Sequence, residues 1–427
     1  MHVARLSLTD FRNYRRADLA FGPGATVIVG RNGQGKTNLV EAIGYLATLG
    51  SHRVSSDQAL IRAGADAAIV RAVLAHGGRE VLLELQLNRQ GANRAQVNRG
   101  AAKPRDLPRY AHSVLFAPED LAIVRGEPSV RRRMLDELLV QRTPRLAGVM
   151  SDYERVLKQR NSLLKSARAR GLAAAQLPTL DIWDERLVAL GAELIDRRLE
   201  LIDELREPVA AAYRSIVDAD HAPELRPVLS VDGADPDDEA TDGAAAGPTA
   251  TTDPTTAASG YRGAADSTTT AERFAATLAA LRRKELERGI TLAGPHRDDV
   301  QLLLNGLPAK GYASHGESWS FALSLRLAAA ELLRRDSTTG DPVLVLDDVF
   351  AELDRLRRER LAAAIGGYEQ VLITAAVLED VPEPLASRVV RIDAGQIVDP
   401  GAATEDAAVE STGAGPADER QREASGV

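Results

Sequence analysis

One short segment of the sequence combines the residue types that bind phosphate. Its glycines allow backbone N–H groups to turn toward an anion, and a helix starting behind them adds partial positive charge. Lys36 would reach the β- and γ-phosphates, and the Thr37 hydroxyl would be a ligand of Mg²⁺. The β-branched run 26–29 predicts the strand that such a loop follows. The sequence therefore predicts a nucleoside triphosphate site made by Gly30, Arg31, Asn32, Gly33, Gln34, Gly35, Lys36 and Thr37.

Two adjacent carboxylates far downstream are the second candidate for chemistry. Residues 343–346 are all apolar and predict a buried parallel strand, with Asp347 and Asp348 directly after it. Sheets of parallel strands bind their ligands at the carboxyl ends of the strands. We expect Asp347 to hold Mg²⁺ and Asp348 to orient or deprotonate the attacking water. The predicted catalytic residues are Asp348, Asp347 and Lys36, and the predicted metal ligands are Thr37 and Asp347.

The elements that must position these residues alternate between strands and helices, which predicts an α/β fold. The expected strands are 3–8, 25–29, 69–74, 81–87, 113–116, 300–304, 343–346, 370–374 and 388–392. The expected helices are one beginning near residue 36, then 130–142, 145–170, 181–215, 272–288, 317–335 and 354–365.

Two further motifs lie on either side of the acidic strand. Ser314, Gly316 and Glu317 precede a helix with apolar periodicity, and Asp354 follows the strand in a short loop. In this order the motifs resemble the head of an ABC-type ATPase, a class of P-loop NTPase. In that class the signature serine and the helix N-terminus behind it touch the γ-phosphate held by a second subunit. The resemblance implies an ATP-dependent homodimer in which Ser314, Gly316, Glu317 and Asp354 complete the ATP site.

Within the ABC-type ATPases the chain resembles the RecF family. Residues 8–14, 30–43, 116–121, 294–299 and 314–354 carry this resemblance. It implies an ATP-dependent DNA-binding protein of recombinational repair and replication that acts at single-strand gaps. It also implies binding to double-stranded, single-stranded and gapped DNA, and weak, DNA-stimulated ATPase activity. The implied partners are RecR and, functionally, RecO and RecA, with promotion of RecA loading and of the SOS response.

The chain departs from the general ABC pattern at two places, and two other segments keep open alternatives. Segment 116–121 has no glutamine at the place of the Q-loop, and residues 374–376 lack the histidine that many ABC ATPases hold against the γ-phosphate. The missing glutamine and histidine are both consistent with slow ATP hydrolysis. Segment 294–299 is either a capped turn or part of the composite ATP site. Arg12 and Asn13 either face the nucleotide or form a surface loop.

Composition and charge exclude several classes of protein. The 427 residues include no cysteine, which excludes disulfides, thiol catalysis and Cys-ligated metals. No apolar run approaches the length of a membrane span, so we expect a cytoplasmic protein without a membrane partner. Segments 232–271 and 399–427 are acidic and poor in large apolar residues, which predicts disorder. Without them the formal charge of −8 becomes +4, so the acidic total does not exclude a nucleic-acid partner.

The expected organisation is an ABC-type head split around a short helical arm. We expect residues 1–130 and 291–398 to form the two parts of the head, residues 131–290 the arm with insertion 232–271, and 399–427 an acidic tail. Residues 125–170 contain twelve Arg and Lys against five acids, which is either a DNA footprint or a solvated helix face. The predicted DNA contacts are Arg131, Arg132, Arg133, Arg155, Lys158 and Arg160.

Two rival functions remain open at this point. One is the nucleotide-binding subunit of another ABC-type ATPase, such as a membrane transporter; the long separation between Lys36 and Asp347 argues against it. The other is a scaffold that binds ATP without cleaving it, and the carboxylate pair Asp347 and Asp348 argues against that function.

Overall fold

The computed structural model describes residues 1–54, 56–172, 177–217, 219, 221–233, 268–393 and 395–398 of the chain. The predicted disordered tail 399–427 lies outside these residues. The predicted disordered insertion 232–271 also lies outside them except at its ends, where Asp232 closes a short 3-10 turn and Thr270 begins a helix.

A six-stranded sheet forms the centre of the head, with strand order β15-β14-β3-β13-β12-β8. The five strands from β14 to β8 run parallel to their neighbours, and only β15 is antiparallel. Strands from both ends of the chain alternate in it, so the sheet joins the two predicted parts of the head. The bounds are β3 Gly24–Val29, β8 Ser113–Phe116, β12 Val343–Asp347, β13 Gln370–Ala375, β14 Val389–Asp393 and β15 Gln396–Val398.

An antiparallel sheet covers one side of this centre. Its strand order is β2-β1-β4-β5-β6-β7. Helix α1 (Lys36–Thr48) shares a hydrophobic core with this sheet and with one face of the central sheet, so it is held between the two. The bounds are β1 His2–Phe11, β2 Tyr14–Ala20, β4 Ala67–His76, β5 Arg79–Asn88, β6 Arg94–Val97 and β7 Gly100–Ala102.

The opposite face of the central sheet is covered by helices. In β12, Val343 and Val345 belong to the core shared with α1, whereas Leu344 and Leu346 belong to the core shared with α8 (His315–Asp336). This alternation follows from the two-residue period of a strand and explains why all four residues are apolar. Helices α2 (Leu121–Arg125), α3 (Pro128–Arg142) and α9 (Arg355–Ile365) complete this layer.

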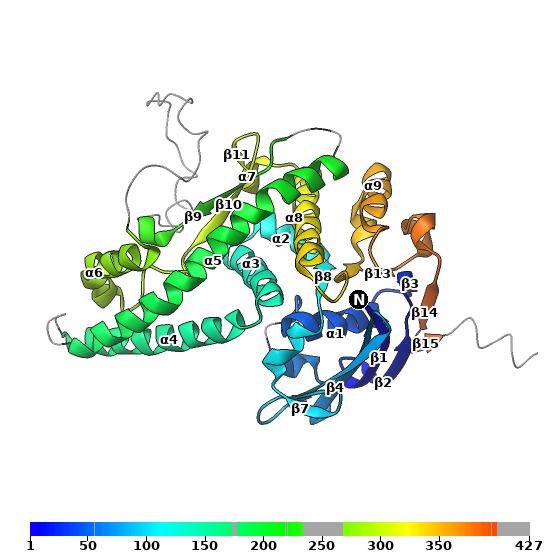
Figure 1. Ribbon diagram of the computed structural model, residues 1–427, viewed down its shortest axis with the longest axis horizontal. Helices are drawn as coiled ribbons and strands as arrows, with labels where there is room; N and C mark the ends of the chain where they lie inside the picture. The colour runs from blue at the N-terminus through cyan, green and yellow to red at the C-terminus, as the bar shows by residue number, and fades with distance from the viewer. Residues whose placement is uncertain are drawn as a thin grey trace, which may run out of the picture.

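The arm consists of α4 (Leu146–Arg170), α5 (Pro178–Ile216) and α6 (Thr270–Arg288), which extend to the left of the head in Figure 1. These three helices share a small apolar core of their own. Helix α5 runs from the arm back to the head, where it lies beside α8 (Figure 1). A three-stranded sheet of β9 (Glu224–Val228), β10 (Asp299–Leu304) and β11 (Leu307–Pro308), followed by the short α7 (Ala309–Tyr312), connects arm and signature helix.

The predicted α/β class is confirmed, and every expected strand and helix overlaps an element of the same type. The sequence does not predict β2, β6, β7, β9, β11 and β15. Strand β2 shows why: it carries charged residues on its exposed side, and its apolar positions are too few to mark a strand. Within the described ranges no helix has the length and apolar composition needed to cross a bilayer.

Candidate functional site

The phosphate loop connects β3 to α1 and is shaped by glycines. Gly35 precedes α1 with φ of 108°, and a side chain there would approach Asn13 and Tyr14 to within 2.8 Å. The Tyr14 hydroxyl donates a hydrogen bond to the Gly35 carbonyl at 3.1 Å, which fixes the loop against β2. Asn13 is exposed and its Nδ2 donates to the carbonyl of Gln34 at 3.2 Å. Asn13 and Tyr14, where β1 turns into β2, therefore hold the phosphate loop in place.

Lys36 is buried beneath the loop. Its Nζ donates to the Gly30 carbonyl at 2.8 Å and lies 3.4 Å from the Arg31 carbonyl and 3.5 Å from Asn32 Oδ1. These carbonyls hold the ammonium in the place where phosphate oxygens can replace them as partners.

The structure brings Asp347 to the phosphate loop, although the two are far apart in sequence. The Thr37 hydroxyl donates to Asp347 Oδ1 at 2.9 Å, and the Thr374 hydroxyl donates to the same oxygen at 2.6 Å. The cause is the strand order: β3, β13 and β12 are parallel neighbours, so their carboxyl ends meet at one edge. His52 Nε2 lies 3.8 Å from Asp347 Oδ2 and has no hydrogen-bond partner among the described residues.

The backbone and carboxylate geometry of Asp348 is compatible with a catalytic role. Its backbone is left-handed, with φ of 51°, and its N–H donates to the Thr374 hydroxyl at 3.0 Å. Its Oδ1 is buried without a hydrogen-bond partner in the part of the chain that the structure describes. Burial raises the pKa of Asp348, the nearby Lys36 ammonium opposes this rise, and Asp347 adds to it. A carboxylate with increased proton affinity and a free oxygen can accept a proton from water.

The residues at this edge fit Mg²⁺. A hydroxyl and a carboxylate, Thr37 and Asp347, supply hard oxygen ligands, and the unpartnered Asp348 oxygen lies beside them. No group of three His, Cys, Asp or Glu side chains in the described ranges could hold a metal. A cation here would therefore take its remaining ligands from phosphate oxygens and water, as Mg²⁺ commonly does.

The signature residues form a second group at the N-terminus of α8. Ser314 is the N-cap: its hydroxyl accepts from the Glu317 N–H at 3.3 Å, and Glu317 Oε2 accepts from the Ser314 N–H at 2.8 Å. Asp354 caps α9 by accepting from the Arg357 N–H at 2.9 Å. Arg357 also donates to Ser320 at 3.1 Å and lies against Gly316, which holds the two helix starts together.

The predicted site residues thus fall into two groups within one chain. Lys36, Thr37, Asp347 and Asp348 belong to the edge of the central sheet, which also holds the rest of the phosphate loop. Among the described residues, the side-chain partners of Ser314, Glu317 and Asp354 lie on α8 and α9 or just before β9, and none lies on the phosphate loop.

Two of the predicted DNA contacts are wrong. Arg131 is buried, pairs with both oxygens of Asp299 at 2.7 Å and donates to two backbone carbonyls. Arg160 has 0% exposure and binds Asp184 and Glu285, each at 2.6 Å, and Thr291. Their guanidinium groups join α3 to β10 and α4 to α5 and α6, respectively. A buried cation with its donors satisfied stabilises the fold and is closed to a DNA phosphate.

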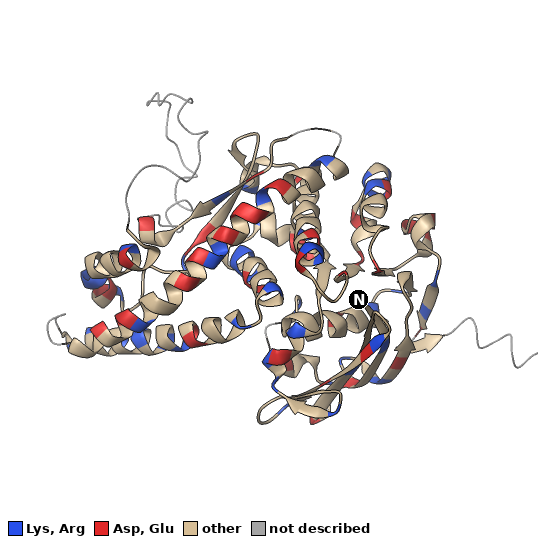
Figure 2. Ribbon diagram, viewed as in Figure 1, with Lys and Arg blue, Asp and Glu red and all other residues tan. Residues whose placement is uncertain are grey.

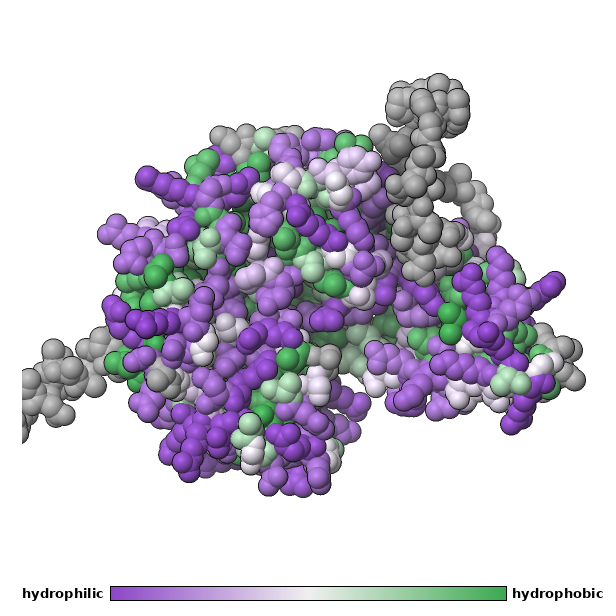
Figure 3. Space-filling view, turned by 180° about the vertical axis from the view of Figure 1, so that it is seen from behind, coloured by the Kyte–Doolittle hydropathy of each residue, from purple (hydrophilic) through white to green (hydrophobic). Residues whose placement is uncertain are grey.

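The other predicted DNA contacts remain predictions. Arg132 is half-buried, donates to the Asp298 carbonyl at 2.6 Å, and has its pKa lowered by burial. Arg133, Arg155 and Lys158 are exposed. In the ribbon of Figure 2, acidic positions alternate with basic ones along α4 and α5. The space-filling view from behind shows a surface that is mostly hydrophilic (Figure 3).

Segment 294–299 makes structural contacts with the arm and with Ser230. Gly294 has φ of 124°, and a side chain there would come within 2.6 Å of the Tyr153 hydroxyl. Asp298 Oδ1 accepts from the Ser230 N–H at 2.9 Å and from its hydroxyl at 2.7 Å. His296 Nδ1 is hydrogen-bonded to the Tyr153 hydroxyl at 2.8 Å. These contacts favour the capped turn of the two open alternatives.

Sequence reasoning does not identify two residues of the site, Thr374 and His52. Thr374 lies at the end of a strand parallel to the acidic strand, and that position is a usable signal in the sequence. His52, in the loop after α1, offered no motif. Arg12, for which the sequence leaves a nucleotide contact and a surface loop open, binds both oxygens of the buried Glu41 at 2.6 and 2.8 Å, so its guanidinium stabilises α1.

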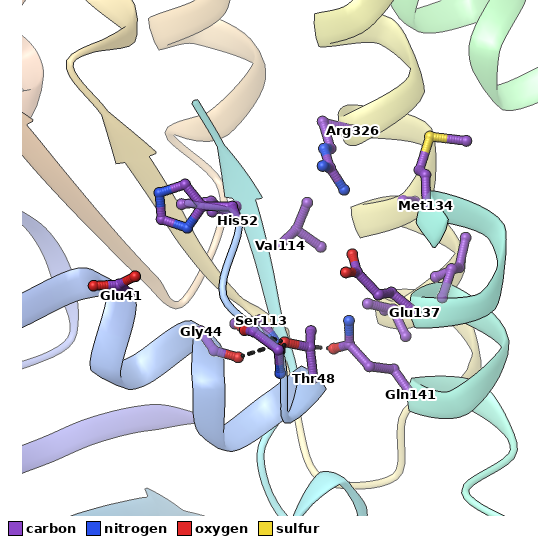
Figure 4. Close-up of a pocket in the computed structure, with 15 residues that line it drawn as sticks. Glu41, Gly44, Thr48, His52, Ser113, Val114, Met134, Glu137, Gln141 and Arg326 are labelled. Atoms are coloured by element: carbon purple, nitrogen blue, oxygen red, sulfur yellow. Dashed lines mark hydrogen bonds between the residues drawn. The ribbon is translucent and has the colours of Figure 1, made fainter. Parts of the chain in front are cut away.

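A small cavity lies next to the site, between α1, β8, α3 and α8. Figure 4 shows Glu137 and Arg326 pointing toward one another in it, with His52 on the opposite wall. Burial raises the pKa of Glu137, and Arg326 pairs with Asp120 at 2.6 Å. The cavity has a volume of about 60 Å³, which is enough for a few waters at most. A nucleotide must therefore bind on the open side of the phosphate loop.

The parallel sheet, the phosphate loop touching Asp347, and the capped signature helix together define an ABC-type P-loop ATPase head. The protein-family model described as RecF/RecN/SMC N terminal domain matches residues 2–393 of the chain. The chain belongs to the RecF family. It is 63% identical over 400 residues to the DNA replication and repair protein RecF of Leifsonia xyli subsp. xyli, covering 94% of this chain and all of that protein. For the protein of the same name from Clavibacter michiganensis subsp. michiganensis the identity is 63% over 416 residues, covering 97% and 100%.

A solved structure of the recombination mediator protein RecF with ATP, in the RecFOR pathway, is similar to this chain with a TM-score of 0.78. The identity is 27%, and the match covers 93% of this chain and 96% of that one. The predicted resemblance to the RecF family is confirmed, which favours DNA repair over a transporter subunit.

Proposed function

We propose that the protein is an ATP-dependent DNA-binding ATPase of recombinational repair and replication that acts at single-strand gaps. In this function it promotes RecA loading and the SOS response. The observation that carries the proposal is the hydrogen bond from Thr37 to Asp347, which joins the phosphate loop to the acidic strand while the signature residues stay apart from it. The names of the relatives, DNA replication and repair protein RecF, support the biological role. This function requires a cytoplasmic location, because its DNA substrate lies there.

ATP binds first through the phosphate loop. Backbone N–H groups of residues 30–37 surround the phosphates, and Lys36 exchanges its carbonyl partners for β- and γ-phosphate oxygens. Thr37 and Asp347 would hold Mg²⁺, which neutralises charge on the phosphates when bound. Asp348 orients a water molecule in line with the γ-phosphorus and takes its proton as the new P–O bond forms. The bond from the γ-phosphorus to the bridging oxygen breaks, and ADP leaves.

The second half of the site comes from another copy of the chain. Ser314, Gly316 and Glu317 lie at the N-terminus of α8, where free N–H groups and the helix dipole favour the γ-phosphate. Asp354 lies at the start of the adjacent helix α9. Two copies related by a two-fold axis would bring each signature to the other's phosphate loop, so ATP stabilises the dimer.

DNA binds to the basic residues that stay exposed. Arg133, Arg155 and Lys158 are the candidates, and their contacts with phosphates would make the affinity fall as salt rises. DNA stimulates the weak ATPase activity, RecR is the direct partner, and RecO and RecA act in the same process. The proposed division gives the head residues 1–130 and 291–398, the arm residues 131–290 with insertion 232–271, and an acidic tail from 399 to 427, with α3 packed on the central sheet of the head.

Capture on immobilised duplex DNA tests this proposal. The wild-type protein should bind more strongly with ATP than without, whereas Lys36→Ala, which loses the phosphate ligand, should bind equally weakly in both. Binding should weaken as salt is raised. Equal capture of the wild type with and without ATP at every salt concentration would contradict an ATP-dependent DNA-binding function.

A further inference from the structure

The end of α5 reaches the signature through a pair of side chains, Tyr213 and His221. Tyr213 lies in the last turn of α5 and is fully buried. Its hydroxyl is hydrogen-bonded to His221 Nδ1 at 2.9 Å, and the same nitrogen lies 3.5 Å from Glu317 Oε1. An imidazole N–H between a phenol oxygen and a carboxylate can hold both. A chain of polar contacts therefore joins α5 to Glu317.

Glu317 is the residue that holds Ser314 in place. One of its carboxylate oxygens accepts from the Ser314 N–H, and the other faces His221. The Ser314 hydroxyl accepts from the Glu317 N–H in return. The rotamer of Glu317 is thus fixed from two sides, by the serine that it caps and by the imidazole. Without His221, the carboxylate would lose the partner that points it toward the Ser314 N–H.

The same end of α5 contacts the two helices that carry the signature group. The ring of Tyr213 packs edge-on against Phe321, one turn further along α8, with ring centroids 6.1 Å apart. Arg360, on α9, donates to the carbonyl of Ile216, the last residue of α5. Asp354 caps that helix α9. A shift of the end of α5 would therefore move the starts of both α8 and α9.

We propose that Tyr213 and His221 are positioning residues for the signature serine, through which α5 sets the orientation of Ser314 toward a nucleotide held by a second copy. The proposal rests on the proposed function, in which Ser314 acts on the other copy's ATP. Helix α5 spans 39 residues, about 58 Å at 1.5 Å per residue, and its other end lies in the arm (Figure 1). One continuous helix, with Pro208 in its interior, thus joins the arm to the side chains that contact the signature residues.

Two substitutions test the proposal without opening a large cavity. Tyr213→Phe removes only the hydroxyl, and His221→Ala removes the imidazole from a partly exposed position. His221→Asn is the conservative variant, because its amide places a polar atom near the position of Nδ1. His76→Ala, at an exposed histidine of β4, is the matched control.

ATP binding to the monomer should be unchanged in all variants, because the phosphate loop is untouched. Loss of one polar support weakens a contact about fivefold, so the Kd of the ATP-dependent dimer, which has two such sites, should rise about 25-fold in His221→Ala and Tyr213→Phe. Hydrogen exchange at the amides of Ser314 and Glu317 should accelerate in the same two variants. His221→Asn should recover most of the dimer affinity, and His76→Ala should match the wild type.

Each outcome separates this proposal from the proposed function. Wild-type protein that stays monomeric with ATP would reject the composite site, while the hydrogen-exchange experiment would still test the contact between His221 and Glu317. If the wild type dimerises with ATP and His221→Ala dimerises equally well with unchanged exchange at Ser314 and Glu317, the positioning role is wrong. A lower melting temperature in His221→Asn together with the same dimer loss as His221→Ala would indicate a purely structural role and would also overturn it.

Discussion

Thr374→Val should lower both the stability of the fold and the rate of ATP hydrolysis, although threonine and valine have nearly the same size. The substitution keeps the shape of a side chain that is buried in β13, but it removes the hydroxyl that donates to Asp347 Oδ1 at 2.6 Å and accepts from the Asp348 N–H at 3.0 Å. A hydrogen bond to a carboxylate contributes about 1.5–3 kcal/mol. Asp347 is itself buried, so water cannot replace the lost donor easily. We expect the free energy of unfolding to fall by about 2 kcal/mol.

The same loss should slow ATP hydrolysis. Asp347 would keep only Thr37 as a hydroxyl partner, and Asp348 would lose the side-chain contact that helps to hold its strained backbone. If about 2 kcal/mol of this orientation is lost in the transition state, single-turnover hydrolysis slows about 30-fold. ATP affinity, measured by calorimetry without Mg²⁺, should change little because Lys36 is unaffected.

Urea denaturation and single-turnover hydrolysis measure the two effects. Thr374→Ser keeps the hydroxyl and should stay near the wild type in hydrolysis. Thr26→Val, at a buried threonine of the neighbouring strand β3, controls for the change of residue type. Wild-type stability and wild-type hydrolysis in Thr374→Val would show that this hydroxyl does not orient the two carboxylates.

Three further predictions concern the site and the arm. Lys36→Ala should abolish ATP binding in calorimetry, because the phosphates lose their buried ammonium partner; undiminished affinity would contradict the phosphate-loop assignment. Asp348→Asn should keep ATP affinity and slow single-turnover hydrolysis about 100-fold or more, and an unchanged rate would remove Asp348 from the role of base. Burial lowers the pKa of His296 to about 4 from 6.5, so only the unfolded chain binds a proton between these values. The free energy of unfolding should therefore be highest above pH 6.5 and fall by at most about 3 kcal/mol as the pH drops to 4, and His296→Gln should flatten that slope in urea denaturation at a series of pH values.

The parts of the site that the sequence predicts are those whose signal is local. The phosphate loop needs glycines and a lysine at fixed spacing between a strand and a helix, and these are adjacent in the chain. The apolar run before Asp347 predicts a buried strand, and the rule for parallel sheets then predicts the edge on which it ends. The capping box of Ser314 and Glu317 is also a pattern within four residues.

The parts that the sequence does not predict depend on contacts between distant segments. Thr374 reaches Asp347 only because β12 and β13 pair in register, and no spacing in the chain encodes that register. Arg160 and an exposed arginine such as Arg155 lie five residues apart on one helix, yet only Arg160 meets carboxylates from α5 and α6. Arginine content alone cannot separate a DNA contact from a buried ion pair.

In the proposed dimer, Ser314 of one copy completes the ATP site of the other, and a mixture of two inactive variants can show this. Lys36→Ala lacks a working phosphate loop and Ser314→Arg lacks a working signature. In a mixed dimer, one site carries both lesions, while the other combines the intact loop of one copy with the intact signature of the other. Random mixing should recover up to about a quarter of the wild-type hydrolysis rate, since about half of the dimers are mixed and each has one working site of two. Hydrolysis that stays at background in the mixture, or full activity of Ser314→Arg alone, would contradict an ATP site shared between two copies.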